Sequence, residues 1–259
     1  MYSVRYDKTF DGLLNVVFFA FSSNNFPVVL LGQDEVTLLG CTDVETVHTN
    51  ANRAARVFAG LRQRLSRLIM EDVLKAWQSE VPGADLLLFR FFCAVFLHGG
   101  NKADDYGNRD ILAMQQLARK VYCEYRSLLG FARFQQSREG LYFCAVRPRY
   151  NVVPLMVSHF VDRFADQPWI LFDVGREFGV YYLPETGRLQ EIFMETATLA
   201  SNGLPLNLLA DSEQQFQHLW KGYCEAIAIP ERRNPKLQTK LLPRKYWQYL
   251  IEHHPNTQG

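Results

Sequence analysis

Residues 141–182 read LYFCAVRPRYNVVPLMVSHFVDRFADQPWILFDVGREFGVYY, and this stretch decides the fold class. Its first eight residues are rich in apolar and aromatic side chains, which is typical of a strand. Apolar residues then recur at helical spacing up to Phe164, with Asn151 as the expected N-cap. Two further strand-like runs, 169–174 and 178–183, flank Gly175 and Arg176. The stretch therefore predicts a strand, a helix and a hairpin.

Similar patterns extend on both sides of this stretch. Residues 131–137 (FARFQQS) predict a strand that forms a first hairpin with residues 141–148. Downstream, residues 189–194 predict another strand, and residues 211–227 a long helix capped by Asp211 or Ser212.

The first half of the chain has mainly helical periodicity. The expected helices are 7–21 with Asp7 or Thr9 as cap, 53–64 opened by Thr49 and Asn50, 66–78, a helix from Pro82 or Gly83 to Leu97, and 110–128 ending at Gly130. Short strand-like pieces are expected at residues 3–6, 28–31 and 35–39. Helices followed by a small antiparallel sheet with flanking helices predict an α+β fold rather than alternating βαβ units.

The 259 residues are interpreted as a single α+β family unit. Its helical part spans residues 1–130, and residues 131–259 contain the hairpins, further helices and a basic C-terminal segment. With 48% apolar residues the chain can bury a substantial core. No stretch is long and apolar enough to span a membrane, and the N-terminus lacks a signal-peptide pattern, so we expect a cytoplasmic protein without a membrane partner.

Several classes of chemistry lack their sequence signatures. The 5 cysteines are far apart and form no CxxC pair, so we expect buried reduced thiols and no metal. The chain has no phosphate-binding GxxxxGK[ST] or GxGxxG motif, no HExxH and no GxSxG, and no cofactor is expected. The HGGN at residues 98–101 follows a helix and is interpreted as its terminator.

Polar side chains are densest within residues 159–176. His159 and Arg163 are four residues apart on the expected helix, and Asp173 and Arg176 lie at the second hairpin. One interpretation makes the arginines phosphate clamps, with His159 or Asp173 as catalytic candidates for acid–base chemistry. The other is an ion-pair network that pins the helix to the hairpin. The spacing leaves both open.

The C-terminal segment, residues 229–252, reads IPERRNPKLQTKLLPRKYWQYLIE and contains the densest positive charge. Clustered cations release counterions from phosphates, and aromatic side chains offer faces to unpaired bases. The predicted nucleic-acid-binding residues are Arg133, Arg163, Arg176, Arg232, Arg233, Lys236, Lys240, Arg244, Lys245, Tyr246 and Trp247. In the alternative, Trp247, Leu242 and Leu250 anchor a terminal helix while the charges stay solvated.

Four motifs resemble one known family across nearly the whole chain. They are YDKTFDGLLNVVF (6–18), GFARF (130–134), the stretch 141–182, and NPKLQTKLLPRKYWQYL (234–250). This bacterial family of uncharacterised function is associated with DNA metabolism or DNA repair. Its domain is encoded beside a radical SAM protein of DNA modification or repair, or is fused ahead of a uracil-DNA glycosylase domain. The 259 residues include no such glycosylase portion.

The resemblance implies a DNA-repair or DNA-metabolism accessory protein that binds DNA and a radical SAM partner. It adds Trp169 to the positions of interest. Two alternatives stay open: an enzyme acting on DNA with a pocket around His159 and Asp173, and a protein–protein scaffold without DNA binding.

Overall fold

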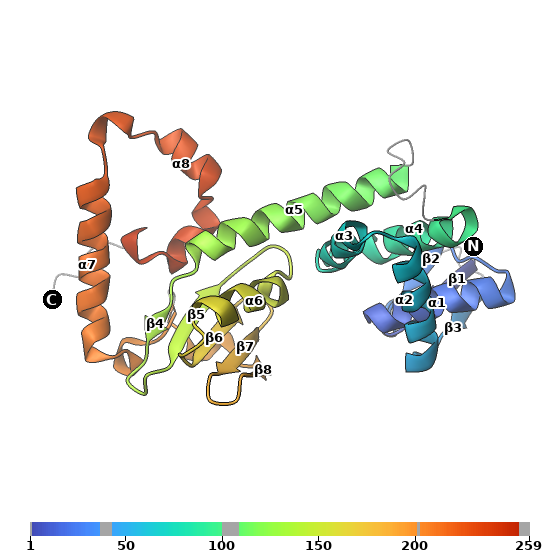
Figure 1. The fold of residues 1–259 in the computed structure, drawn as a ribbon, viewed down its shortest axis with the longest axis horizontal. Helices are drawn as coiled ribbons and strands as arrows, with labels where there is room; N and C mark the ends of the chain where they lie inside the picture. The colour runs from blue at the N-terminus through green and yellow to red at the C-terminus, as the bar shows by residue number, and fades with distance from the viewer. Residues whose placement is uncertain (1, 37–42, 100–108, 201–202, 254–259) are drawn as a thin grey trace. The chain divides into compact units, whose positions relative to one another are not determined.

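The computed structural model describes residues 2–36, 43–99, 109–200 and 203–253 (Figure 1). The fold class is α+β, as the sequence predicts. The chain divides into two compact units, Met1–Tyr122 and Cys123–Gly259. The division falls inside one helix, α5 (Arg109–Phe131), rather than in a loop. Gly130 lies within this helix instead of ending it, because its backbone does not adopt the left-handed conformation of a C-cap.

The first unit packs helices against a small parallel sheet. Its helices are α1 (Phe10–Ser23), α2 (Ala51–Arg64), α3 (Arg67–Trp77), α4 (Ala84–His98) and the first part of α5. The sheet has the order β2 (Val29–Leu31), β1 (Tyr2–Arg5), β3 (Asp43–Thr46). The expected strand at residues 35–39 falls mostly outside the described residues.

Side-chain caps define three of these helices. Thr9 Oγ1 accepts a hydrogen bond from Gly12 N at 2.9 Å, and the Asn50 and Ser66 side chains accept from Arg53 N and Ile69 N. At the other end of α4, Gly99 adopts a φ of 80°, which favours glycine and ends the helix. The interpretation of HGGN as a helix terminator is therefore confirmed at Gly99.

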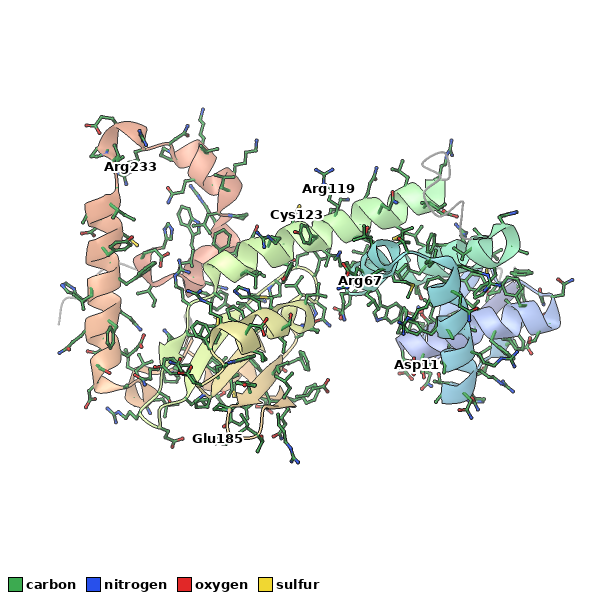
Figure 2. All side chains as sticks on the ribbon, viewed as in Figure 1. Asp11, Arg67, Arg119, Cys123, Glu185 and Arg233 are labelled. Carbon is green, nitrogen blue, oxygen red and sulfur yellow. The ribbon has the colours of Figure 1, made fainter. Side chains whose placement is uncertain are left out.

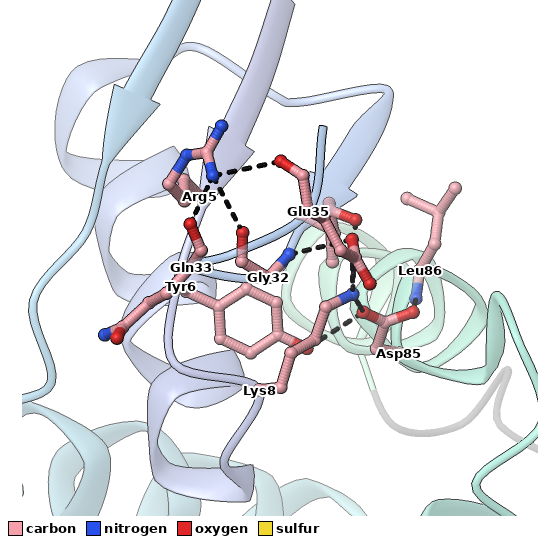
Figure 3. A network of polar contacts seen from close by, with 9 residues as sticks. Arg5, Tyr6, Lys8, Gly32, Gln33, Glu35, Asp85 and Leu86 are labelled. Atoms are coloured by element: carbon pink, nitrogen blue, oxygen red, sulfur yellow. Dashed lines mark hydrogen bonds and ion pairs between the residues drawn. The ribbon is translucent and has the colours of Figure 1, made fainter. Parts of the chain in front are cut away.

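A polar network holds α4 to the end of β1 in this unit (Figure 3). Asp85 Oδ2 accepts from Tyr6 Oη at 2.9 Å and from Lys8 Nζ at 2.8 Å. Lys8 Nζ also lies 3.7 Å from Glu35 Oε2. Arg5 Nη1 donates to the carbonyl oxygen of Gly32 at 3.1 Å. Because the Tyr6 ring is fully buried, its hydroxyl depends on Asp85 for a partner.

We expect the Asp85→Ala substitution to lower the free energy of unfolding by about 2 kcal/mol, because it leaves the Tyr6 hydroxyl buried without an acceptor. The measurement is urea unfolding followed by circular dichroism. Glu35→Gln is the matched control, since the Glu35 side chain is 55% exposed and should contribute less than about 1 kcal/mol. Equal losses in the two variants would contradict this account.

The second unit is built on a five-stranded sheet. Its order is β4 (Gln135–Gln136), β5 (Tyr142–Val146), β6 (Trp169–Asp173), β7 (Phe178–Leu183), β8 (Arg188–Phe193). The predicted hairpins β4–β5 and β6–β7 are confirmed, and β8 pairs antiparallel with β7. The structure adds one parallel pair, β5–β6. Helix α6 (Val153–Arg163) forms the connection between these strands and packs against β6 and β7 (Figure 1).

The rest of this unit is a long helix followed by short helical turns. Helix α7 (Asp211–Ile227) leads through η4 (Pro230–Arg232) into α8 (Pro235–Leu241), η5 (Arg244–Tyr249) and η6 (Ile251–His253). The short 3-10 helices η2 (Thr196–Thr198) and η3 (Leu206–Leu208) precede α7. The expected helix caps were wrong here: Val152 and Ala210 occupy the N-cap positions of α6 and α7, and neither makes a side-chain cap. Pro154 at the start of α6 lacks the backbone N–H that a cap would bind.

Candidate nucleic-acid interface

Proline residues divide the basic segment, residues 229–252, into short helical turns. Helix α8 starts at Pro235, and Asn234 caps it by accepting from Leu237 N at 3.0 Å. Lys236 and Lys240 are four residues apart, so they share one face of this helix. Leu237 and Leu241 share the neighbouring face. The segment therefore presents two chemically different surfaces.

Six cations of this segment are exposed. They are Arg232, Arg233, Lys236, Lys240, Arg244 and Lys245. Figure 2 labels Arg233 at the turn that follows α7. Among the residues that the structure describes, no ion pair is found for the first four. The Arg244 guanidinium lies over the Trp247 ring, 5.6 Å from its centroid.

Lys245 and Tyr246 make internal contacts with Glu124 of α5. Lys245 Nζ lies 2.5 Å from Glu124 Oε1, and the Tyr246 hydroxyl donates to the same oxygen. The backbone N–H groups of Arg149 and Tyr150 donate to this carboxylate at 2.9 and 2.8 Å. Burial opposes ionisation of Glu124, but these hydrogen bonds outweigh it and lower its pKa. Burial of the Tyr246 hydroxyl, together with its hydrogen bond to the charged Glu124, raises the pKa of Tyr246.

Trp247 is also held by the protein itself. Its Nε1 donates to the carbonyl oxygen of Leu242 at 2.9 Å, and its ring stacks on His253 with centroids 4.4 Å apart. Leu250 is fully buried and Tyr246 is nearly so. The predicted anchoring of this segment through Leu250 is thus confirmed, and Tyr246 lies inward while most of the cations lie outward.

Arg133 belongs to a second internal cluster. Its Nη2 lies 2.7 Å from Glu252 Oε1, and its guanidinium lies over the ring of Trp220 on α7. Trp220 Nε1 donates to the same Glu252 carboxylate at 3.0 Å. Burial opposes ionisation of Glu252, but the contacts with Arg133 and Trp220 outweigh it and lower its pKa. The cluster joins α7 to η6.

Asp173 and Arg176 form an ion pair at the β6–β7 turn. Arg176 Nη1 lies 2.8 Å from Asp173 Oδ2, and Gly175 N donates to Asp173 Oδ1 at 2.8 Å. Arg176 also donates to the carbonyl oxygen of Arg149 at 3.2 Å. Asp173 is fully buried, which raises its pKa more than Arg176 lowers it. The pair therefore closes the turn and holds the chain that leads into α6.

The other predicted positions of this region lie on α6 and within the sheet. The half-buried His159 ring packs edge-on against Phe160, and exposed Arg163 lies over Phe164. In the described part of the chain, no hydrogen bond or ion pair links His159 or Arg163 to Asp173. Trp169 is 1% exposed and stacks with Tyr182 at 5.3 Å between ring centroids. The structure thus brings Asp173 together with Arg176 and leaves His159 apart from both.

Glu124 and Glu252 are the principal residues that sequence reasoning missed. Each is an acidic residue in a helical segment, and nothing in the local pattern distinguishes it from a solvated one. Their partners are 121 and 119 residues away in the chain.

The cysteines differ in their exposure to solvent. Cys93 and Cys144 are buried, as expected, and burial raises the pKa of both thiols to about 12. The expectation was wrong for Cys123, which is exposed on α5 (Figure 2), while Cys41 lies outside the described residues. Over the described ranges, no group of three His, Cys, Asp or Glu side chains is placed to hold a metal ion. No helix in those ranges has both the length and the apolar character needed to cross a membrane.

The structure thus defines an α+β protein with an outward-facing basic segment. Residues 82–252 match the model of the family described as Domain of unknown function (DUF4130). Because this match covers more than half of the chain, the protein belongs to that family. A comparison with curated proteins gives no match.

Proposed function

We propose that this protein is a DNA-binding accessory protein of DNA repair or DNA metabolism that works with a radical SAM partner. The observation that carries DNA binding is the set of exposed cations Arg232, Arg233, Lys236, Lys240 and Arg244 in a chain whose net charge is only +1. Such a local excess of positive charge favours a polyanion, because phosphate contacts release condensed counterions. The repair context and the partner are supported by the motif resemblance alone.

Lys236 and Lys240 provide the sharpest test of DNA binding. Both are exposed on α8, and the Lys236→Glu/Lys240→Glu variant retains residue types that favour helix. We expect it to bind a fluorescein-labelled single-stranded oligonucleotide about 30-fold more weakly than the wild type in fluorescence anisotropy. The slope of log affinity against log salt should also fall by about 1.5, since each lost phosphate contact accounts for about 0.7 to 0.9.

The matched control is Arg62→Glu/Arg188→Glu, which makes the same change in net charge at exposed positions of α2 and β8. It should retain most of the affinity. DNA binding by this segment is refuted if both double variants bind like the wild type. An equal loss in the two variants would also refute it, because net charge alone would then explain the binding.

The proposed radical SAM partner is tested by co-expression. Co-expression with the radical SAM protein encoded beside members of the resembled family should give a complex that elutes together after nuclease treatment. A complex that forms while neither protein binds DNA would favour the protein–protein scaffold instead.

A further inference from the structure

An open groove lies beside the C-terminal end of α7, between that helix, η4 and α8. It has a volume of about 1100 Å³. Its apolar lining includes Ile227 at the end of α7, Ile229 just after that helix, and Leu237 and Leu241 of α8. These side chains are between 47% and 64% exposed. These apolar side chains can receive the apolar face of a helix, as in other helix-in-groove interfaces.

Exposed apolar side chains are concentrated in residues 206–241, and four of them line this groove: Ile227, Ile229, Leu237 and Leu241. Ten of the 22 large apolar residues that are exposed in the described structure lie between Leu206 and Leu241. A helix that covers its apolar stripe against its own core would leave few such residues in water. Within α7 only Glu213 is buried. This concentration indicates an interaction surface rather than scattered surface residues.

The groove has a small excess of positive charge. Lys221, Arg232 and Arg233 line it together with Glu225 and Glu252. Glu252 is already engaged by Arg133 and Trp220, so its charge is largely compensated. An occupant with acidic side chains beside an apolar stripe would match both the lining and these cations.

The lining favours a peptide over a nucleic-acid strand. Unpaired bases are held mainly by stacking on aromatic faces, whereas the apolar side chains of the groove are mainly aliphatic. Its aromatic residue Trp247 stacks on His253. We propose that this groove binds an acidic amphipathic helix of a partner protein. The groove shares Arg232 and Arg233 with the proposed DNA contacts, whereas Lys236 and Lys240 do not line it, so variants of these two lysines distinguish the two sites.

The probe for this proposal is a designed fluorescein-labelled helical peptide of about 18 residues, which has a leucine stripe flanked by glutamates. The matched probe has lysine in place of every glutamate. We expect the acidic peptide to bind the full-length protein at least 10-fold more tightly than the basic one. The Leu237→Ser/Leu241→Ser variant should weaken its binding at least 10-fold.

Leu219→Ser is the control variant, because Leu219 is 65% exposed on α7 and lies outside the groove lining. It should bind the acidic peptide like the wild type, and Lys236→Glu/Lys240→Glu should change the affinity less than 3-fold. The proposal is overturned if the two peptides bind equally. It is also overturned if Leu237→Ser/Leu241→Ser weakens oligonucleotide binding and not peptide binding, which would assign the groove to nucleic acid.

Discussion

Replacing Glu124 by alanine is expected to lower the free energy of unfolding of the second unit by about 3 to 5 kcal/mol. The Glu124 side chain is 7% exposed and accepts from Lys245, Tyr246 and the backbone N–H groups of Arg149 and Tyr150. Its removal leaves these donors without their acceptor and frees η5 from α5. The measurement is urea unfolding followed by tryptophan fluorescence.

Smaller changes to the same cluster serve as controls. Tyr246→Phe removes one donor and should cost about 1 kcal/mol. Lys245→Met should cost less, because the Lys245 side chain is 45% exposed and solvent screens its charge. If Glu124→Ala costs no more than Lys245→Met, the carboxylate does not organise this region.

The Glu124 cluster also predicts a dependence on pH. The pKa of Glu124 is lowered from its usual 4.5. Its stabilising contribution is therefore fully present above about pH 4.5 and is lost as the pH falls through the folded-state pKa. The difference in unfolding free energy between wild type and Glu124→Gln should narrow as the pH falls from 6 to about 3. A constant difference over this range would contradict the assigned ionisation.

Trp169→Ala is expected to lower the free energy of unfolding by about 3 to 5 kcal/mol, because it opens a cavity in the second unit. The buried Trp169 ring packs against Phe134, Phe160 and Tyr182, with centroid distances of 6.3, 6.2 and 5.3 Å. Since the substitution removes a fluorophore, the measurement is urea unfolding by circular dichroism.

The indole nitrogen of Trp169 supplies the control. Its Nε1 is buried and has no hydrogen-bond partner within the described residues. Trp169→Phe keeps most of the packing and removes this unpaired donor, so it should cost less than about 2 kcal/mol. A loss equal to that of Trp169→Ala would show that the indole nitrogen has an important partner.

Local signals explain which elements could be predicted from the sequence. Thr9, Asn50 and Ser66 mark helix starts because each side chain can accept from a nearby backbone N–H group. The hairpins could be predicted because their strands are joined by short turns. The sheet of the first unit could not, because β1 pairs in parallel with strands that follow much later in the chain. Pairing direction and partner are set by long-range packing, which periodicity does not encode.

In the candidate site, too, local features could be predicted from the sequence and long-range contacts could not. The cluster of cations could be read from residues 232–245, but their environment could not. Lys240 and Lys245 have the same side chain on the same segment, yet the first is exposed without a described ion pair and the second contacts Glu124. That difference depends on a carboxylate 121 residues away. The sequence therefore predicts the amount of positive charge, and the structure shows which part of it remains available.

The division of the chain inside α5 has a practical consequence for shortened versions of this protein. The sequence predicts that the helix ends at Gly130, which would place the start of a C-terminal fragment at that residue. Such a fragment would lose Glu124 while keeping Lys245 and Tyr246. A fragment meant to preserve the C-terminal unit should start upstream of residue 123, so that the helical turn carrying this carboxylate is retained.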